Sequence, residues 1–307
     1  LTKIVAVNPN VTVVLQNGSV VAMPWADQVP AIVETYLAGE AVGEATWDIL
    51  TGKVNPSGKL SESFPLRLAD NPTYGTFAKD HDEEDYHEGL FVGYRYYDLH
   101  AMPVRFPFGH GLSYTQFDYG DLTVNEESDS VKVTFTVTNT GKVAGKEAAQ
   151  VYVANHISRV EMPVKELRDF AKVALQPGES KTVTVNLSRR AFSYYNVAKQ
   201  QWEADNGAYE IMVGSSSRDI RLTTDFTLTI GVNPLGTITG DTYVGDVWAD
   251  KDPRVQAALK ESGLYEILEP MMKDEQWVAI SANMPLRSLA AMGISEQARQ
   301  AFFDALK

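Results

Sequence analysis

The sequence GEATWDILTGKVNPSGKLSESFP, residues 43–65, predicts a helix, a tight turn and a short strand in succession. Its first part has one apolar helical face, and Gly52 stands where a helix end favours a residue able to adopt positive φ. Residues 55–58, Asn-Pro-Ser-Gly, are a dense turn signal. Residues 60–65 then alternate apolar and serine side chains and end at a proline, although Glu62 falls on the apolar face. This order indicates one αβ unit of a layered sheet. The helical face is formed by Ala45, Ile49 and Leu50, with Trp47 beside them.

The segment before this unit predicts further parts of an open α/β sheet. Residues 11–15, VTVVL, suit a parallel strand buried on both faces, and residues 19–23 predict a short second strand. Residues 26–37 predict a helix with one apolar stripe. The stripe consists of Val29, Ile32, Val33 and Tyr36. Strand, helix, helix and strand in this order favour part of an α/β sandwich over residues 1–68.

Residues 69–116 predict an extended connector that packs on its neighbours. Residues 80–84, DHDEE, are too polar to be buried, whereas residues 88–98, EGLFVGYRYYD, are aromatic-rich and favour an extended segment. A free linker would carry fewer Tyr and Phe residues. Glu88 and Arg95 could contact a sugar, but a structural ion pair that holds the connector is the better interpretation, because aromatic neighbours would shield it.

Residues 117–232 predict an antiparallel β-sandwich of the immunoglobulin or fibronectin type III kind. Apolar and polar side chains alternate in four runs, near 131–137, 182–187, 209–213 and 226–230. Turn signals separate such runs in β-sandwiches, and Asn206-Gly207 predicts a hairpin turn before the third run.

Residues 233–307 predict a linker followed by a helical tail. Helices are expected near 253–261, 265–274 and 295–306, and the apolar side chains among them are expected to dock on another domain. These side chains are Trp248, Leu264, Met271, Trp277 and Phe302. The predicted fold class is therefore multidomain: a partial α/β sandwich, a fibronectin type III-like β-sandwich and a C-terminal helical tail.

Composition excludes several kinds of protein. The chain has 307 residues, a net charge of -13 and scattered basic residues, so a nucleic-acid surface is not expected. Without cysteine there is no disulfide, thiol catalyst or cysteine-bound zinc; the absence fits any compartment and weakly favours a bacterial cytoplasmic chain. No apolar run approaches the roughly 20 residues of a membrane span, so no membrane partner is expected. No cofactor is expected, because no dinucleotide or phosphate-binding fingerprint is present.

Six longer segments, in their order and spacing, resemble glycoside hydrolase family 3, and most closely its three-domain β-glucosidases. They are VVLQNGSVVAMPW (13–25), AGEAVGEATWDILTGKVNPSGKLSESFP (38–65), YHEGLFVGYRYYD (86–98), FPFGHGLSYTQF (106–117), PVKELRDFAKVALQPGESKTVTVNL (163–187) and VGSSSRDIRL (213–222). The resemblance covers most of residues 1–232. It implies retaining hydrolysis of β-glycosides, which needs a nucleophile and an acid/base carboxyl group about 5–5.5 Å apart.

The same resemblance implies where the catalytic groups lie. In the family the nucleophilic Asp is on a barrel domain, and the acid/base Glu is on a loop before the strand that corresponds to residues 11–15. Both are therefore expected before Leu1, which enters directly into apolar sequence. We expect this chain to be a C-terminal portion that carries no catalytic residue. It would support an N-terminal, barrel-containing part of the same enzyme, with a β-glucoside or oligosaccharide as substrate. β-Xylosidase and arabinofuranosidase activity remain open, as does a homodimer.

Three residues are candidates for substrate contact: Trp25, Asp82 and Glu84. Trp25 follows the predicted sheet edge, where ligands of open α/β sheets bind, and could stack on a sugar. Packing in a core or between domains is the commoner role of such an aromatic residue. Asp82 and Glu84 could reach an active-site rim, but a solvated acidic loop is the usual meaning of such a run. His81 and His87 lie nearby without the spacing of a calcium loop, so no metal site is expected.

A rival interpretation is a non-catalytic carbohydrate-binding or adhesion module. It requires a row of exposed aromatic side chains on one face of the β-sandwich. Tyr194, Tyr195 and Trp202 are the best candidates, although neighbouring residues of a strand point to opposite faces.

Overall fold

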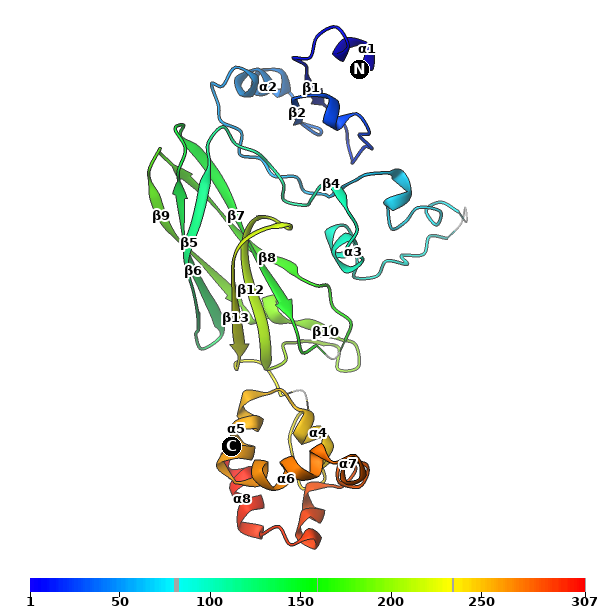
Figure 1. The fold of residues 1–307 in the computed structure, drawn as a ribbon, viewed down its shortest axis with the longest axis vertical. Coiled ribbons are helices and arrows are strands. Elements are labelled where there is room, and N and C mark those ends of the chain that lie inside the picture. Colours follow the sequence, from blue (N-terminus) through cyan, green and yellow to red (C-terminus); the bar gives the residue numbers. More distant parts are fainter. Residues whose placement is uncertain (80–82, 159, 234, 307) are drawn as a thin grey trace.

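The computed structural model describes residues 1–79, 83–158, 160–233 and 235–306, which form three units in a row (Figure 1). A small α/β unit stands at one end, a β-sandwich lies in the middle, and a cluster of short helices forms the other end. The connector that contains β4 and α3 runs between the α/β unit and the sandwich. No helix among the described residues has the length and apolar character needed to cross a membrane.

The α/β unit contains two parallel strands, β1 (Thr12–Leu15) and β2 (Ala31–Glu34), paired from Thr12↔Ala31 to Leu15↔Glu34. The predicted helix over residues 26–37 is wrong: a 3-10 turn, η1 (Ala26–Gln28), precedes strand β2. The apolar residues of this segment fit a helical stripe, but its β-branched Ile32 and Val33 suit a strand, and short apolar runs do not distinguish the two. The strand expected over residues 19–23 is absent; that segment is irregular.

The helix of the αβ unit is confirmed as α2 (Val42–Leu50), and Gly52 has φ +73° as expected for its end. The strand after it is shorter than predicted. It is β3 (Phe64–Pro65), paired with β4 (Val104–Phe106) of the connector. A short helix, α1 (Thr2–Val5), begins the chain. Met23, Ala26 and Phe64 form the small apolar core of the unit.

The connector is not extended where its aromatic segment was expected to be. Gly93, at φ +61°, precedes helix α3 (Tyr94–Leu99). Tyr94 packs with Tyr152, Ala154 and Met212 of the sandwich in a small apolar cluster. The connector therefore lies on the sandwich, and Tyr94, with Phe108 beside it, serves that contact.

The β-sandwich has one sheet of four strands in the order β13-β12-β7-β8 and one of three in the order β5-β6-β9. Neighbouring strands within each sheet are antiparallel. The alternating runs fill the core between the sheets, with Val131, Val133, Phe135 and Val137 fully buried. The strands are β5 (Phe117–Glu126), β6 (Ser130–Asn139), β7 (Gly145–Asn155), β8 (Glu166–Leu175), β9 (Ser180–Ser188), β12 (Gly207–Ser216) and β13 (Asp219–Leu228).

Asn206-Gly207 is not the hairpin turn that was predicted. A separate hairpin of β10 (Tyr194–Asn196) and β11 (Gln201–Glu203) comes before it, and β12 turns back into β13 near Arg218. Asn206 is instead buried, and its side-chain nitrogen donates to Asp252 Oδ2 at 3.0 Å. This pair joins the sandwich to the helical segment.

The helical segment has its own apolar core, so the expectation that its side chains dock on another domain is wrong. Leu264 and Phe302 are buried in this core, Trp248 and Met271 pack against it, and Trp277 remains 47% exposed. The elements are α4 (Val244–Ala249), α5 (Pro253–Glu261), α6 (Leu264–Lys273), α7 (Glu275–Ser281), η4 (Leu286–Met292) and α8 (Glu296–Ala305).

We predict that Phe135→Ala destabilises the sandwich by about 3–5 kcal/mol, because it leaves a cavity where a fully buried ring had been. Thr136→Ala, one position along β6 on the opposite face, should cost less than about 1 kcal/mol. Urea unfolding followed by circular dichroism measures both. Equal losses for the two variants would contradict the assignment of faces.

Candidate functional site

The carboxyl ends of β1 and β2 bring together three titratable side chains that we call the sheet-edge cluster: Glu34, Tyr36 and Glu62. Tyr36 has φ +47°, an unusual backbone conformation for a tyrosine, and its backbone N–H donates to Glu34 Oε1 at 2.8 Å. The other carboxylate oxygen of Glu34 is enclosed and has no hydrogen-bond partner among the described residues. Burial and then the charge of Glu62 raise the pKa of Tyr36.

Burial, followed by the neighbouring charge of Glu34, raises the pKa of Glu62 as well. Two carboxyl groups therefore share the edge at which open α/β sheets bind their ligands. Sequence reasoning did not pair them. The available signal was Glu62, which broke the alternation predicted for residues 60–65 by placing an acid among the apolar positions.

Trp25 and Glu84, two of the three predicted substrate residues, have separate local contacts. Trp25 is half-buried and packs on the apolar core of the α/β unit. Glu84 accepts a hydrogen bond from the backbone N–H of Ala78 at 2.8 Å. Asp82, like His81, lies outside the described residues. In the part of the chain that is described, no group of three or more His, Asp or Glu side chains could hold a metal ion.

The connector motif forms an ion pair with a partner other than the one predicted. Arg95 binds Glu166 of β8, at 3.1 Å, rather than Glu88. Asp98, on the same helix, accepts from Lys165 at 2.7 Å and from Arg218 at 3.1 Å. The side chains of Asp98 and Lys165 are only 7% and 12% exposed, so this bond is largely shielded from water, whereas Arg218 is 32% exposed. Helix α3 is thus fixed on the sandwich by charged hydrogen bonds.

The turn at residues 55–58 makes the second set of contacts to the sandwich, which we call the interdomain clamp: Asn55, Lys59 and Glu147. Asn55 Nδ2 donates to the carbonyl of Ala144 at 3.0 Å, and Asn55 Oδ1 accepts from the Tyr114 N–H at 2.8 Å. Lys59 pairs with Glu147 of β7 at 3.1 Å, with side chains 13% and 6% exposed. The clamp joins the αβ unit, the connector and the sandwich.

Tyr119 completes the surroundings of Glu147. Its hydroxyl donates to Glu147 Oε1 at 2.7 Å. Burial and then the Glu147 charge raise the pKa of Tyr119, which keeps the phenol protonated and able to donate. The buried carboxylate therefore has two donors, as a buried charge requires.

Two glycines allow the connector to approach the clamp closely. A Cβ on Gly111 would lie 2.2 Å from the carbonyl oxygen of Gly58, and one on Gly109 would lie 2.1 Å from Gln150 Oε1. The backbones of Leu60 and Gly109 instead bond each other, with Gly109 N–H donating to Leu60 O at 2.7 Å. The Gly109-x-Gly111 motif is therefore a packing requirement of this joint.

Comparison with known proteins agrees with this architecture. A family model described as the glycosyl hydrolase family 3 C-terminal domain matches residues 1–114, and one described as a fibronectin type III-like domain matches residues 147–217. Thermostable β-glucosidase B of Acetivibrio thermocellus is 46% identical over 292 residues, which cover 92% of this chain and 38% of that protein. An exo-α-(1->6)-L-arabinopyranosidase of Bifidobacterium breve is 40% identical over 296 residues, 95% of this chain and 39% of that protein.

The solved structures agree. The crystal structure of a Bifidobacterium adolescentis GH3 β-glucosidase matches with a TM-score of 0.75 and 39% identity, over 84% of this chain and 38% of that one. The fold is thus that of a multidomain chain with a partial α/β sandwich and a fibronectin type III-like domain. The chain matches the C-terminal part of longer glycoside hydrolase family 3 proteins, of whose length it spans less than half.

We predict that Lys59→Met lowers the free energy of unfolding by about 1.5–3 kcal/mol, because it leaves the buried Glu147 carboxylate without its cationic donor. Lys53→Met is the matched control: Lys53 pairs with Asp48 at 2.9 Å but is 72% exposed, so its removal should cost little. Denaturant unfolding measures both. Indistinguishable losses would show that the clamp contributes no more than a surface ion pair.

We also predict that Glu62→Gln stabilises the protein at pH 7. A carboxyl group with a raised pKa penalises the folded state once it is ionised. The penalty is absent below its ordinary pKa of 4.5 and is complete above the folded pKa. The gain should therefore shrink as the pH falls toward 4. Glu44→Gln, at an exposed position in the first turn of α2, should give no gain. A Glu62→Gln variant that is less stable than the parent at pH 7 would contradict this.

Proposed function

We propose that this chain is the C-terminal part of a retaining β-glucosidase, in which it supports a catalytic barrel and an acid/base loop that lie outside it. The observation that carries this proposal is the interdomain clamp. It fixes the α/β unit, whose edge would face the catalytic part, onto a rigid sandwich. The contact between Lys59 and Glu147 is buried, hydrogen-bonded and supported by close backbone packing.

The surface of the α/β unit supports the proposal of a covering partner. Several of its large apolar side chains are exposed on a unit whose own core is small. Contiguous exposed apolar surface marks interaction sites. The exposed side chains are Ile4, Val7, Val14, Leu37, Trp47, Leu50 and Val54. We infer that the partner is the N-terminal, barrel-containing part of the same enzyme.

The chemistry is assigned to that partner as well. A retaining glycosidase needs a nucleophile and an acid/base carboxyl group across the scissile bond. We propose that both lie outside this chain and that Glu34 and Glu62 shape the sheet edge without reacting. Contact of Trp25, Asp82 and Glu84 with substrate stays a prediction, in which Trp25 would stack on a sugar at the edge of the cleft.

The proposed substrate is a terminal β-D-glucoside, the class named by the β-glucosidase relatives. A pentose substrate is the second candidate, because the Bifidobacterium breve relative of similar coverage is named an L-arabinopyranosidase. β-Xylosidase and arabinofuranosidase activity belong to the same group of alternatives. Loops of the barrel would decide among them.

We predict that the isolated chain does not hydrolyse p-nitrophenyl β-D-glucopyranoside. When it is mixed or co-expressed with the N-terminal part of the Acetivibrio thermocellus relative, it should form a stable complex that does hydrolyse this glucoside. The complex should form less readily with Lys59→Met, because the α/β unit would then be held less firmly, whereas Lys53→Met should leave it unchanged. Gel filtration and initial rates give the two readouts.

Turnover by the isolated chain at a rate typical of glycosidases would overturn the assignment of the catalytic groups. The complex could instead hydrolyse p-nitrophenyl α-L-arabinopyranoside but no β-glucoside. That result would support the proposed supporting role and replace the proposed substrate.

A further inference from the structure

A polar groove runs along the open edge of the sandwich, where β8 of one sheet meets β9 of the other. We call it the β8–β9 groove; its volume is about 250 Å³. Its polar lining comes from Arg168, Asp169, Asn186, Ser188 and Arg190. Both strands end their sheets, so the groove is bordered by edges that no further strand covers.

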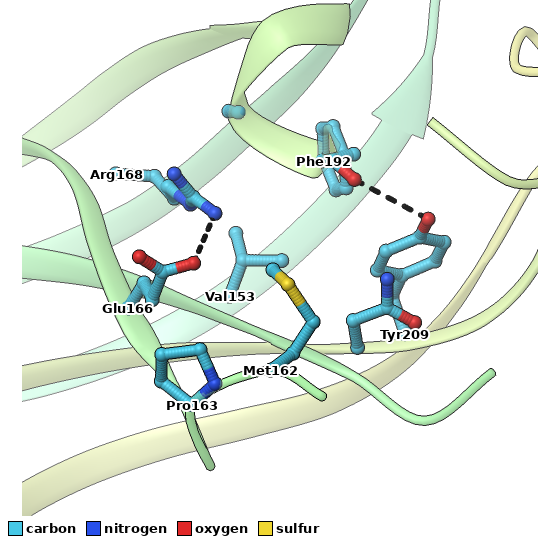
Figure 2. A pocket seen from close by; sticks show the side chains of 9 residues that line it. Val153, Met162, Pro163, Glu166, Arg168, Phe192 and Tyr209 are labelled. Carbon is cyan, nitrogen blue, oxygen red and sulfur yellow. Dashed lines mark hydrogen bonds and ion pairs between the residues drawn. The ribbon is translucent and has the colours of Figure 1, made fainter. Parts of the chain in front are cut away.

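Arg168 is a fixed donor at the floor of this groove. Its guanidinium binds Glu166 (Figure 2). Glu166 also binds Arg95 of the connector. Burial, together with the charges of Arg95 and Arg190, lowers the pKa of Arg168. A second, smaller cavity behind it is also lined by Arg168. Arg168 Nε is enclosed and has no hydrogen-bond partner among the described residues. Arg168 is therefore held in place by Glu166, and its Nε is closed off from the groove.

Arg190 extends the groove toward an aromatic pair. Its guanidinium lies over the Trp202 ring, 3.1 Å from the ring centre. Trp202 faces Tyr195 across the β10–β11 hairpin, with ring centres 5.3 Å apart. These rings are 47% and 45% exposed, whereas Tyr194 is buried. In the ranges that the structure describes, Arg190 has no ion-pair partner within 4 Å, so its nitrogen atoms are available to a ligand.

The combination fits a saccharide better than an ion or an apolar ligand. Sugar C–H faces pack on aromatic rings, and each hydroxyl group both donates and accepts hydrogen bonds. Asp169 accepts, Arg168 and Arg190 donate, and Asn186 does both. Asp169 at the rim disfavours a free anion, and the polar lining disfavours an apolar guest. We propose that the β8–β9 groove, with Trp202 and Tyr195 at its end, is an accessory binding site for a neutral oligosaccharide chain. The site is separate from the proposed catalytic function.

The test uses the whole chain and cellohexaose, with xylohexaose and inorganic phosphate as further probes, in isothermal titration calorimetry. Cellohexaose or xylohexaose should bind, and phosphate should not. Trp202→Ala should weaken saccharide binding at least about tenfold, and Asn186→Ala should weaken it as well. Trp277→Ala is the matched control, because Trp277 is also 47% exposed but lies on α7; it should leave the affinity unchanged.

Circular dichroism of each variant checks that the sandwich is intact. The proposal is overturned if neither hexasaccharide binds, if phosphate binds in their place, or if Trp277→Ala weakens binding as much as Trp202→Ala does. None of these results bears on the glycosidase assays, since binding is measured without turnover.

Discussion

The buried ion pair between Lys59 and Glu147 is the contact on which the arrangement of this chain depends. Lys59 follows the tight turn of the αβ unit, and Glu147 lies on a strand of the sandwich, so one interaction joins two independent folds. A buried ion pair is a weak source of net stability, but it is intolerant of misalignment, because either charge left alone in the interior is costly. The pair therefore specifies how the two units meet. At Gly111 the connector backbone comes so close to the carbonyl of Gly58 that a Cβ would not fit there.

The connector turns this single contact into a rigid joint. Helix α3 is held on the sandwich by two sets of ion pairs. Arg95 binds Glu166, and Asp98 binds Lys165 and Arg218. Within the connector, the Tyr94 ring stacks on Phe108 with the ring centres 4.6 Å apart. The sandwich is thus contacted at two places, by the interdomain clamp and by helix α3. The apolar core of the α/β unit is small, so these contacts add to what holds its edge in position. The proposed role in presenting an acid/base loop to a barrel needs such a joint. The proposal that the catalytic groups lie outside the chain rests instead on the resemblance to the longer relatives.

The sequence predicted the elements whose patterns are local and missed those that depend on distant partners. The alternation of Val131 to Val137 was enough to identify a sandwich strand, and Gly52 was enough to end α2. The segment at residues 26–37 fitted a helix by its spacing, but pairing with β1 made it a strand. Arg95 was given a partner close in sequence, because nothing local points to Glu166. The joining of Glu34 and Glu62 at the sheet edge depends on the same long-range pairing, so only the odd placement of Glu62 was visible beforehand.

Native-state hydrogen exchange tests the central claim, that the joint is as rigid as the sandwich itself. The informative amides are those of Leu60 and Gly109, which bond across the joint, and of Leu167, which donates to the Tyr94 hydroxyl. The account predicts that these amides exchange as slowly as the amide of Val133 in the core strand β6, because each exchanges only when the whole unit opens. Rapid exchange of all three while Val133 remains protected would show that the α/β unit and connector are loosely tethered, and would contradict the account.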